Sequence, residues 1–173
     1  MPDEKPLVGV VMGSTSDADV MRGCADILRE LGIPYEMKVL SAHRTPDQTR
    51  EYAVSATGRG IEVIIAGAGW AAHLAGFMAA NTILPVIGIP IDSSPLKGND
   101  ALLSTVQMPP GIPVATMAVG SGGAKNAAVL AAQILALKYP HISEKLQGYR
   151  KALTQKAMEK ADAWTGWAER GIR

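Results

Sequence analysis

The chain has 173 residues, of which 47 % are hydrophobic and 19 % are charged, and its formal net charge is +1. This profile is typical of one globular domain and excludes a disordered chain. The low net charge and an aromatic content of 5 % argue against nucleic-acid binding, which uses basic surfaces and stacking aromatic side chains. One cysteine, Cys24, excludes an intramolecular disulfide, and its place on an apolar helical stripe favours a buried thiol.

The first residues carry both signs of charge and pass directly into an apolar run at residue 7. They show no basic region followed by a long apolar segment and a cleavage site, and no stretch has the length of a transmembrane helix. We therefore expect a cytoplasmic protein without a membrane partner.

Short apolar runs alternate along the chain with segments of helical periodicity. The runs predict strands at 7–12, 34–40, 61–67, 84–91 and 112–119. The intervening segments predict helices at about 17–31, 46–57, 71–81 and 124–137, with a further short helix capped by Asn99 or Asp100. The second run is the least apolar, which favours a place near the edge of the sheet. This alternation indicates βαβ units and hence an α/β fold with a parallel sheet, in one domain over 1–173 with its core at about 7–139.

A last amphipathic helix is predicted over about 141–165. Its apolar residues step by threes and fours: Ile142, Leu146, Tyr149, Leu153, Ala157, Ala161 and Trp164. The helix could cover its own sheet, or it could pack on another subunit, since the doubly wound unit is complete without it.

Polar residues that follow the strands are informative, because ligands of parallel sheets bind at the carboxyl ends of strands. The loop after the first strand contains Ser14, Ser16 and Asp17. Hydroxyl groups and free N–H groups at a helix start suit a phosphate, although Ser16 or Asp17 could also serve only as an N-cap. The loop matches neither the G-x-G-x-x-G pattern nor a P-loop.

The loop after the second strand, "SAHRTPD", has two kinds of residue. Thr45 and Pro46 suit the N-cap and the first turn of the next helix. His43 and Arg44 contribute nothing to capping, and a guanidinium is a bidentate partner for phosphate. These two residues are therefore candidates for function.

The segment after the third strand, 66–76, is rich in Gly and Ala, which would let the backbone approach a ligand closely. Close packing of a helix on the sheet would explain some of these glycines equally well. The segment 120–126, before the fifth helix, is a second candidate wall of the site.

Several chemistries find no support. His43, His73 and His141 are far apart in the sequence, so no metal site is predicted, and no G-x-S-x-G element is present. The residue set points to proton transfer on a phosphorylated small molecule, with no metal and no covalent intermediate.

Five segments together resemble the class I family of N5-carboxyaminoimidazole ribonucleotide mutases. They follow one another at family spacing from about Leu7 to Tyr139: "VVMGSTSD", "SAHRTPD", "VIIAGAGWAAHLAG", "SPLKGNDALLSTVQMPPGIPVATMAVG" and "GAKNAAVLAAQIL". The resemblance implies a flavodoxin-like three-layer α/β/α domain and a homo-octamer in which the C-terminal helix reaches neighbouring subunits. It also implies transfer of a carboxylate from N5 to C4 of the imidazole, without ATP, metal or organic cofactor.

The resemblance assigns roles by matching position. It implies that His43 is the general acid/base and that Ser14, Asp17 and Arg44 bind the mononucleotide. The remaining pocket residues implied in the same way are Ser16, Ser41, Gly67, Ala68, Gly69, His73 and Leu74.

Two positions depart from the common family pattern, in which the third loop reads GAGGAAHLPG. Trp70 stands where that pattern has Gly, and Ala75 where it has Pro. We expect the Trp70 side chain to face away from the pocket. Two other functions stay open: a carboxylase that uses 5-aminoimidazole ribonucleotide and CO2 directly, and a flavin- or nucleotide-binding module without catalysis.

Overall fold

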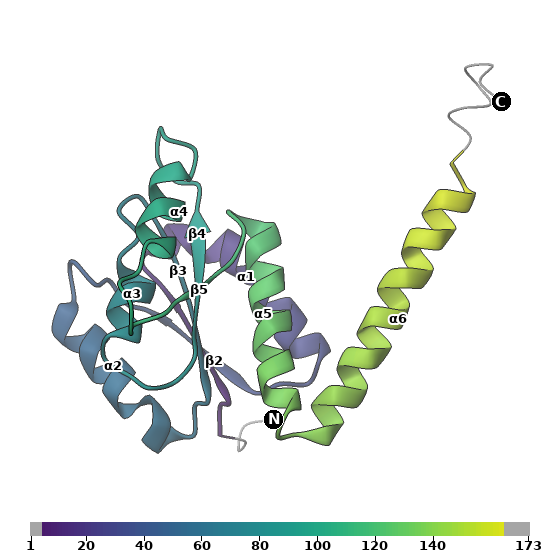
Figure 1. The fold of residues 1–173 in the computed structure, drawn as a ribbon, viewed down its shortest axis with the longest axis horizontal. Coiled ribbons are helices and arrows are strands. Elements are labelled where there is room, and N and C mark those ends of the chain that lie inside the picture. The colour runs from purple at the N-terminus through teal and green to yellow at the C-terminus, as the bar shows by residue number, and fades with distance from the viewer. Residues whose placement is uncertain (1–4, 165–173) are drawn as a thin grey trace.

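The computed structural model describes residues 5–164 and contains a parallel sheet of five strands in the order β2-β1-β3-β4-β5 (Figure 1). The strands are β1 (Val8–Met12), β2 (Tyr35–Val39), β3 (Val63–Gly69), β4 (Val86–Ile91) and β5 (Ala115–Thr116). Val8 is in register with Tyr35 on one side and Val63 on the other. The order is that of flavodoxin-like folds, so the predicted fold class is confirmed, as is the edge position of β2.

Helices cover both faces of the sheet, giving three layers (Figure 1). The helices are α1 (Ala18–Glu30), α2 (Pro46–Arg59), α3 (Leu74–Ala79), α4 (Asn99–Val106), α5 (Ser121–Ala136) and α6 (Pro140–Asp162), with a 3-10 turn η1 (Thr15–Asp17) before α1. In Figure 1, α1 and α5 lie on one side of the sheet and α2, α3 and α4 on the other.

Two hydrophobic clusters hold these layers together. Val8 and Val10 of β1 belong to the cluster under α1 and α5, whereas Val11 belongs to the cluster under α2 and α3. This alternation explains why the strand reads as an unbroken apolar run, because each of its faces is covered. Cys24 is fully buried in the first cluster, and burial raises the pKa of its thiol to about 12.

Several element boundaries differ from the predicted ones, and α5 in particular begins at Ser121, three residues before its predicted start. β3 continues to Gly69, two residues beyond its predicted end, and β5 is limited to two residues at the edge of the sheet. The predicted cap of α4 is wrong: Gly98, with φ +81°, is the N-cap, and Asn99 and Asp100 are already in the helix.

Helix α6 leaves the body of the domain (Figure 1). Ile142 and Leu146 near its start are buried against α5, but every described residue from 151 onward is exposed. Leu153 is 50 % exposed and Trp164 is also 50 % exposed. The outer part of α6 therefore does not cover its own sheet. The last residue of the predicted helix, residue 165, lies outside the described residues.

Among the described residues, no helix combines the length and apolar character that a membrane span requires.

Two neighbouring glycines in the first turn of α5 provide a matched stability test. A Cβ at Gly123 would overlap the backbone oxygen of Ala118, whereas a Cβ at Gly122 would meet nothing within 4 Å. We expect Gly123→Ala to lower the free energy of unfolding by at least about 2 kcal/mol, because the start of the helix must move away from the backbone of Ala118. Gly122→Ala should be neutral or slightly stabilising. Denaturant unfolding of both variants would check this, and equal stabilities would contradict it.

Candidate functional site

The chain reverses its direction of travel across the sheet between β1 and β3. From β1 it passes outward to β2, then returns to the other side of β1 and continues through β3, β4 and β5. The crevice outside the carboxyl ends of strands at such a switch point is the usual ligand site of open parallel sheets.

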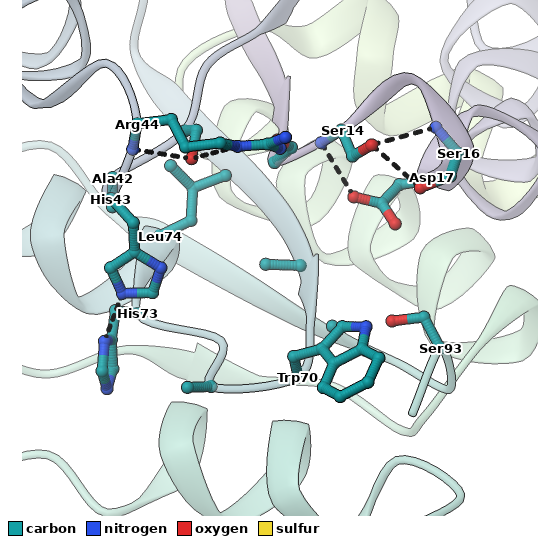
Figure 2. A pocket seen from close by; sticks show the side chains of 15 residues that line it. Ser14, Ser16, Asp17, Ala42, His43, Arg44, Trp70, His73, Leu74 and Ser93 are labelled. Atoms are coloured by element: carbon teal, nitrogen blue, oxygen red, sulfur yellow. Dashed lines mark hydrogen bonds between the residues drawn. The ribbon is translucent and has the colours of Figure 1, made fainter. Parts of the chain in front are cut away.

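A cavity of about 570 Å³ lies at this switch point and is called the switch-point cavity below. Segments at the carboxyl ends of β1, β2, β3 and β4 contribute to it, and Figure 2 shows many of their side chains. Its lining residues are Gly13, Ser14, Ser16, Asp17, Ser41, Ala42, His43, Arg44, Ala68, Gly69, Trp70, Ala71, His73, Leu74 and Ser93. The structure thus brings together all the site residues named from the sequence except Gly67.

The loop after β1 is a capping box around η1. The Ser14 hydroxyl accepts a hydrogen bond from the Ser16 backbone N–H at 3.3 Å, and the Asp17 carboxylate accepts one from the Ser14 backbone N–H at 3.0 Å. The Ser16 hydroxyl donates to that of Ser14 at 2.9 Å. Ser14 is the N-cap of η1, whereas Asp17 occupies the N-cap position of α1 without making a side-chain capping bond to that helix. The same bonds hold two hydroxyl groups at the cavity.

Asp17 is unusual because the residue is only 4 % exposed although it lines the cavity. Burial raises the pKa of Asp17 above its ordinary value, against the lowering effects of the Ser14 N–H and the Arg44 guanidinium. An ionised carboxylate at this place is unfavourable for folding. Its position at the wall of a cavity is a common sign of a functional group.

The loop after β2 holds Arg44 against the loop after β1. One guanidinium nitrogen of Arg44 donates to the carbonyl oxygen of Gly13 at 3.0 Å, and its backbone N–H donates to the Ser41 hydroxyl at 3.1 Å. Thr45 occupies the N-cap position of α2 as predicted, but its hydroxyl bonds to Ser41 and makes no capping bond to the helix. Ser41, predicted as a ligand contact, is thus also the residue that orders this loop.

His43 and His73 are in direct contact, although 30 residues separate them. Nε2 of His43 lies 2.7 Å from Nδ1 of His73, and the two rings meet edge to face with centroids 4.9 Å apart. One nitrogen of the pair must donate and the other accept. Figure 2 shows the other nitrogen of His43, Nδ1, on the side of the cavity. Their distance in sequence was therefore a poor guide to their distance in space.

Gly67 does not line the cavity, contrary to the prediction. It lies within β3, where a Cβ would overlap the sulfur of Met21, and its carbonyl oxygen accepts the N–H of Gly13 at 3.1 Å. Close packing explains this glycine. The segment 120–126 is also absent from the cavity wall, because it follows β5, which lies two strands from β3.

The sequence did not identify Gly13, Ala42, Ala71 or Ser93 as lining residues, and it misplaced Trp70. Ser93 follows β4, and the rule used for the other strands would have found it; a Cβ at Gly69 would overlap its hydroxyl. Trp70 was expected to face away from the pocket, and this is wrong. Its indole lies at the cavity beside Ser93 (Figure 2), while the residue as a whole is 60 % exposed.

Within residues 5–164, no group of three or more His, Cys, Asp or Glu side chains is arranged to hold a metal ion. The two histidines that do meet contact each other directly at 2.7 Å.

The fold and this cavity define a flavodoxin-like protein that places an imidazole, a guanidinium and hydroxyl groups around one small-molecule site. A family model described as AIR carboxylase matches residues 7–156, and the chain belongs to this family.

Relatives and solved structures agree with this assignment. The N5-carboxyaminoimidazole ribonucleotide mutase of Pyrococcus horikoshii is 60 % identical over 161 residues, which are 93 % of this chain and 90 % of the relative. The protein of the same name from Bacillus subtilis is 56 % identical over 158 residues, which are 91 % of this chain and 98 % of the relative. The crystal structure of Treponema denticola PurE superposes with a TM-score of 0.83 at 30 % identity, covering 92 % of this chain and 99 % of that one.

Replacing Asp17 tests whether its buried charge opposes folding. Because its pKa is raised in the folded state, ionised Asp17 destabilises the fold at neutral pH, and this penalty disappears as the pH falls through its folded pKa. We expect Asp17→Asn to raise the free energy of unfolding at pH 7, since an amide oxygen can still accept the Ser14 N–H. The gain over wild type should shrink on acidification.

The matched control is Asp19→Asn, because the Asp19 side chain is 88 % exposed and pairs with Arg22 at the surface. Denaturant unfolding at several pH values would check both variants. A loss of stability in Asp17→Asn at pH 7 would show that the charge is favourable and contradict the expectation.

Proposed function

We propose that this protein is an N5-carboxyaminoimidazole ribonucleotide mutase. It moves the carboxylate from N5 to C4 of the imidazole and forms 4-carboxy-5-aminoimidazole ribonucleotide, a reaction of de novo purine biosynthesis. The observation that carries the proposal is that His43 and the hydroxyl and guanidinium groups of two loops share one cavity. The printed names of the relatives, at 56–60 % identity over most of the chain, support the same activity.

The substrate's phosphoribosyl group is assigned to the part of the cavity formed by the first two loops. Arg44 offers a fixed cation, and the hydroxyl groups of Ser14 and Ser16 offer donors beside it. Charge-assisted bonds of this kind suit a phosphate. The Asp17 carboxylate is an acceptor for hydroxyl groups of the sugar, which explains why a buried charge is kept there.

The reaction is assigned to the end of the cavity that contains His43. Protonation of N5 breaks the bond from N5 to the carboxyl group and releases CO2 within the cavity. The electron-rich C4 then attacks this CO2, and loss of the C4 proton restores the aromatic ring. His43 gives the first proton and takes the second, so it ends in its starting state, as an imidazole can near neutral pH.

The contact between the two histidines orients this acid/base. Because Nε2 of His43 is bonded to His73 at 2.7 Å, its ring is held and Nδ1 is left for the substrate. The lining of the cavity includes the apolar side chains of Ala42, Ala68, Ala71 and Leu74. These apolar groups would retain CO2 next to C4, which raises its effective concentration and limits its escape.

A direct carboxylase is the second candidate, because the matching family model is described as AIR carboxylase. Purified protein should be given either N5-carboxyaminoimidazole ribonucleotide or 5-aminoimidazole ribonucleotide with bicarbonate, both without ATP. The mutase should convert the first substrate at low substrate concentration, as followed by the absorbance of the product. Conversion of only the second mixture would refute the mutase assignment in favour of the carboxylase.

The proposal extends to assembly and to location. A homo-octamer is proposed from the family resemblance and from the exposed outer part of α6, on which Leu153 is half exposed. The cytoplasmic location predicted from the sequence stays a prediction.

Replacing His43 tests its assigned role. We expect His43→Asn to lower turnover of N5-carboxyaminoimidazole ribonucleotide by about 10²–10⁴-fold, while product affinity stays within about tenfold, because proton transfer and binding are separable. Steady-state kinetics and calorimetric binding would measure both. His141→Asn is the matched control, since His141 lies on α6 outside the cavity. Turnover close to wild type in His43→Asn would remove this residue from the mechanism.

Replacing one residue of α6 tests the assembly. Light scattering after gel filtration should give the wild type a mass of eight times 18.2 kDa. We expect Leu153→Glu to give smaller species, because a carboxylate would be buried at the subunit contact. Gln155→Glu, on the opposite side of the helix, should not change the mass. A monomeric wild type, or an unchanged mass for Leu153→Glu, would contradict the assigned interface.

A further inference from the structure

Trp70 has a backbone conformation that its side chain disfavours. It is the first residue after β3 and has φ +55°, in the left-handed region. Within residues 5–164, the only other non-glycine residue with positive φ is Lys97, at +53°. A residue with a Cβ is destabilised there by roughly 1–2 kcal/mol, which a glycine would avoid.

The indole does not compensate for this by packing in the protein. Trp70 is 60 % exposed and belongs to neither hydrophobic core cluster. A large aromatic group at a strained and exposed position therefore has no explanation in the folding of this domain. Strained residues of this kind occur preferentially at ligand sites.

The indole has a defined place in the switch-point cavity. Figure 2 shows it on the same side as Ser93, across the cavity from Ser14 and Asp17, with His43 at the other side. Apart from the two histidines, it is the only aromatic residue in the lining of this cavity. It is therefore the only broad, uncharged aromatic face that the cavity offers to a planar heterocycle.

We propose that Trp70 is a substrate-binding residue whose indole stacks on the aminoimidazole ring. This inference rests on the proposed function, which supplies the heterocycle, and it adds a residue that neither the family pattern nor the sequence had placed in the site. The loops with Ser14, Ser16 and Arg44 hold the phosphate, whereas Trp70 recognises the ring. Stacking of this kind strengthens binding and orients the ring plane for proton transfer.

The test separates the ring from the sugar phosphate. Calorimetry would measure the affinity of the product, 4-carboxy-5-aminoimidazole ribonucleotide, and of ribose 5-phosphate, which lacks the heterocycle. We expect Trp70→Gly to weaken binding of the product by about five- to fiftyfold, the usual effect of losing one base–aromatic stack. Ribose 5-phosphate should bind within about twofold of wild type. Trp70→Phe should keep most of the product affinity.

The matched control is Lys97→Gly, which relieves the same backbone strain at an exposed residue outside the cavity. Both glycine variants should have a melting temperature equal to or above that of the wild type, but only Trp70→Gly should lower the affinity for the product. If Trp70→Gly fails to fold, Trp70→Asn replaces it, because Asn tolerates the left-handed region and lacks an aromatic face.

Two results would overturn the inference. Product affinity unchanged in Trp70→Gly and Trp70→Asn would show that the indole does not contact the ring. An equal loss of affinity for the product and for ribose 5-phosphate would show that Trp70 only shapes the loop. Failure of the proposed function is a separate result: wild-type protein would then bind the product but not turn over N5-carboxyaminoimidazole ribonucleotide.

Discussion

The pairing of β1 with β3 is the interaction on which the site depends. Their parallel register runs from Val8 with Val63 to Met12 with Gly67, and it continues past the end of β1 through the bond from the Gly13 N–H to the Gly67 carbonyl oxygen. This last bond fixes the start of the first loop. Arg44 then bonds to the carbonyl oxygen of the same Gly13, so the second loop is placed relative to the first. Two loops separated in sequence thus share one anchor on the central strands.

The sequence was most informative where local physics decides the structure. Apolar runs identified the strands, because every strand of the centre is covered on both faces, and polar residues after strands identified most of the cavity. The sequence was least informative where tertiary contacts determine which residues meet. The contact between His43 and His73 joins loops after β2 and β3, strands that do not pair with each other. Gly67 looked like a ligand contact, but its small size serves the packing of Met21 against the sheet.

In the C-terminal part of the chain, too, the sequence did not reveal how the elements are arranged in space. The fifth apolar run forms a strand of only two residues, since an edge strand pairs on one side and Pro113 in that run cannot donate a backbone hydrogen bond. The segment 120–126 has the composition of a ligand loop, yet the strand order carries it away from the switch point. Composition alone could not supply that order.

Two residues that break local rules border one cavity. Asp17 keeps a carboxylate where burial disfavours its charge, and Trp70 keeps a bulky side chain where a glycine would relax the backbone. A sequence selected only for folding would avoid both choices, because a neutral side chain at residue 17 and a glycine at residue 70 suit the fold better. Since the two residues face each other across the same space, one ligand can explain both: its sugar hydroxyls would satisfy the carboxylate, and its ring would cover the indole. The stability lost at each position is then recovered when the substrate binds, because a ligand stabilises the folded state that holds it.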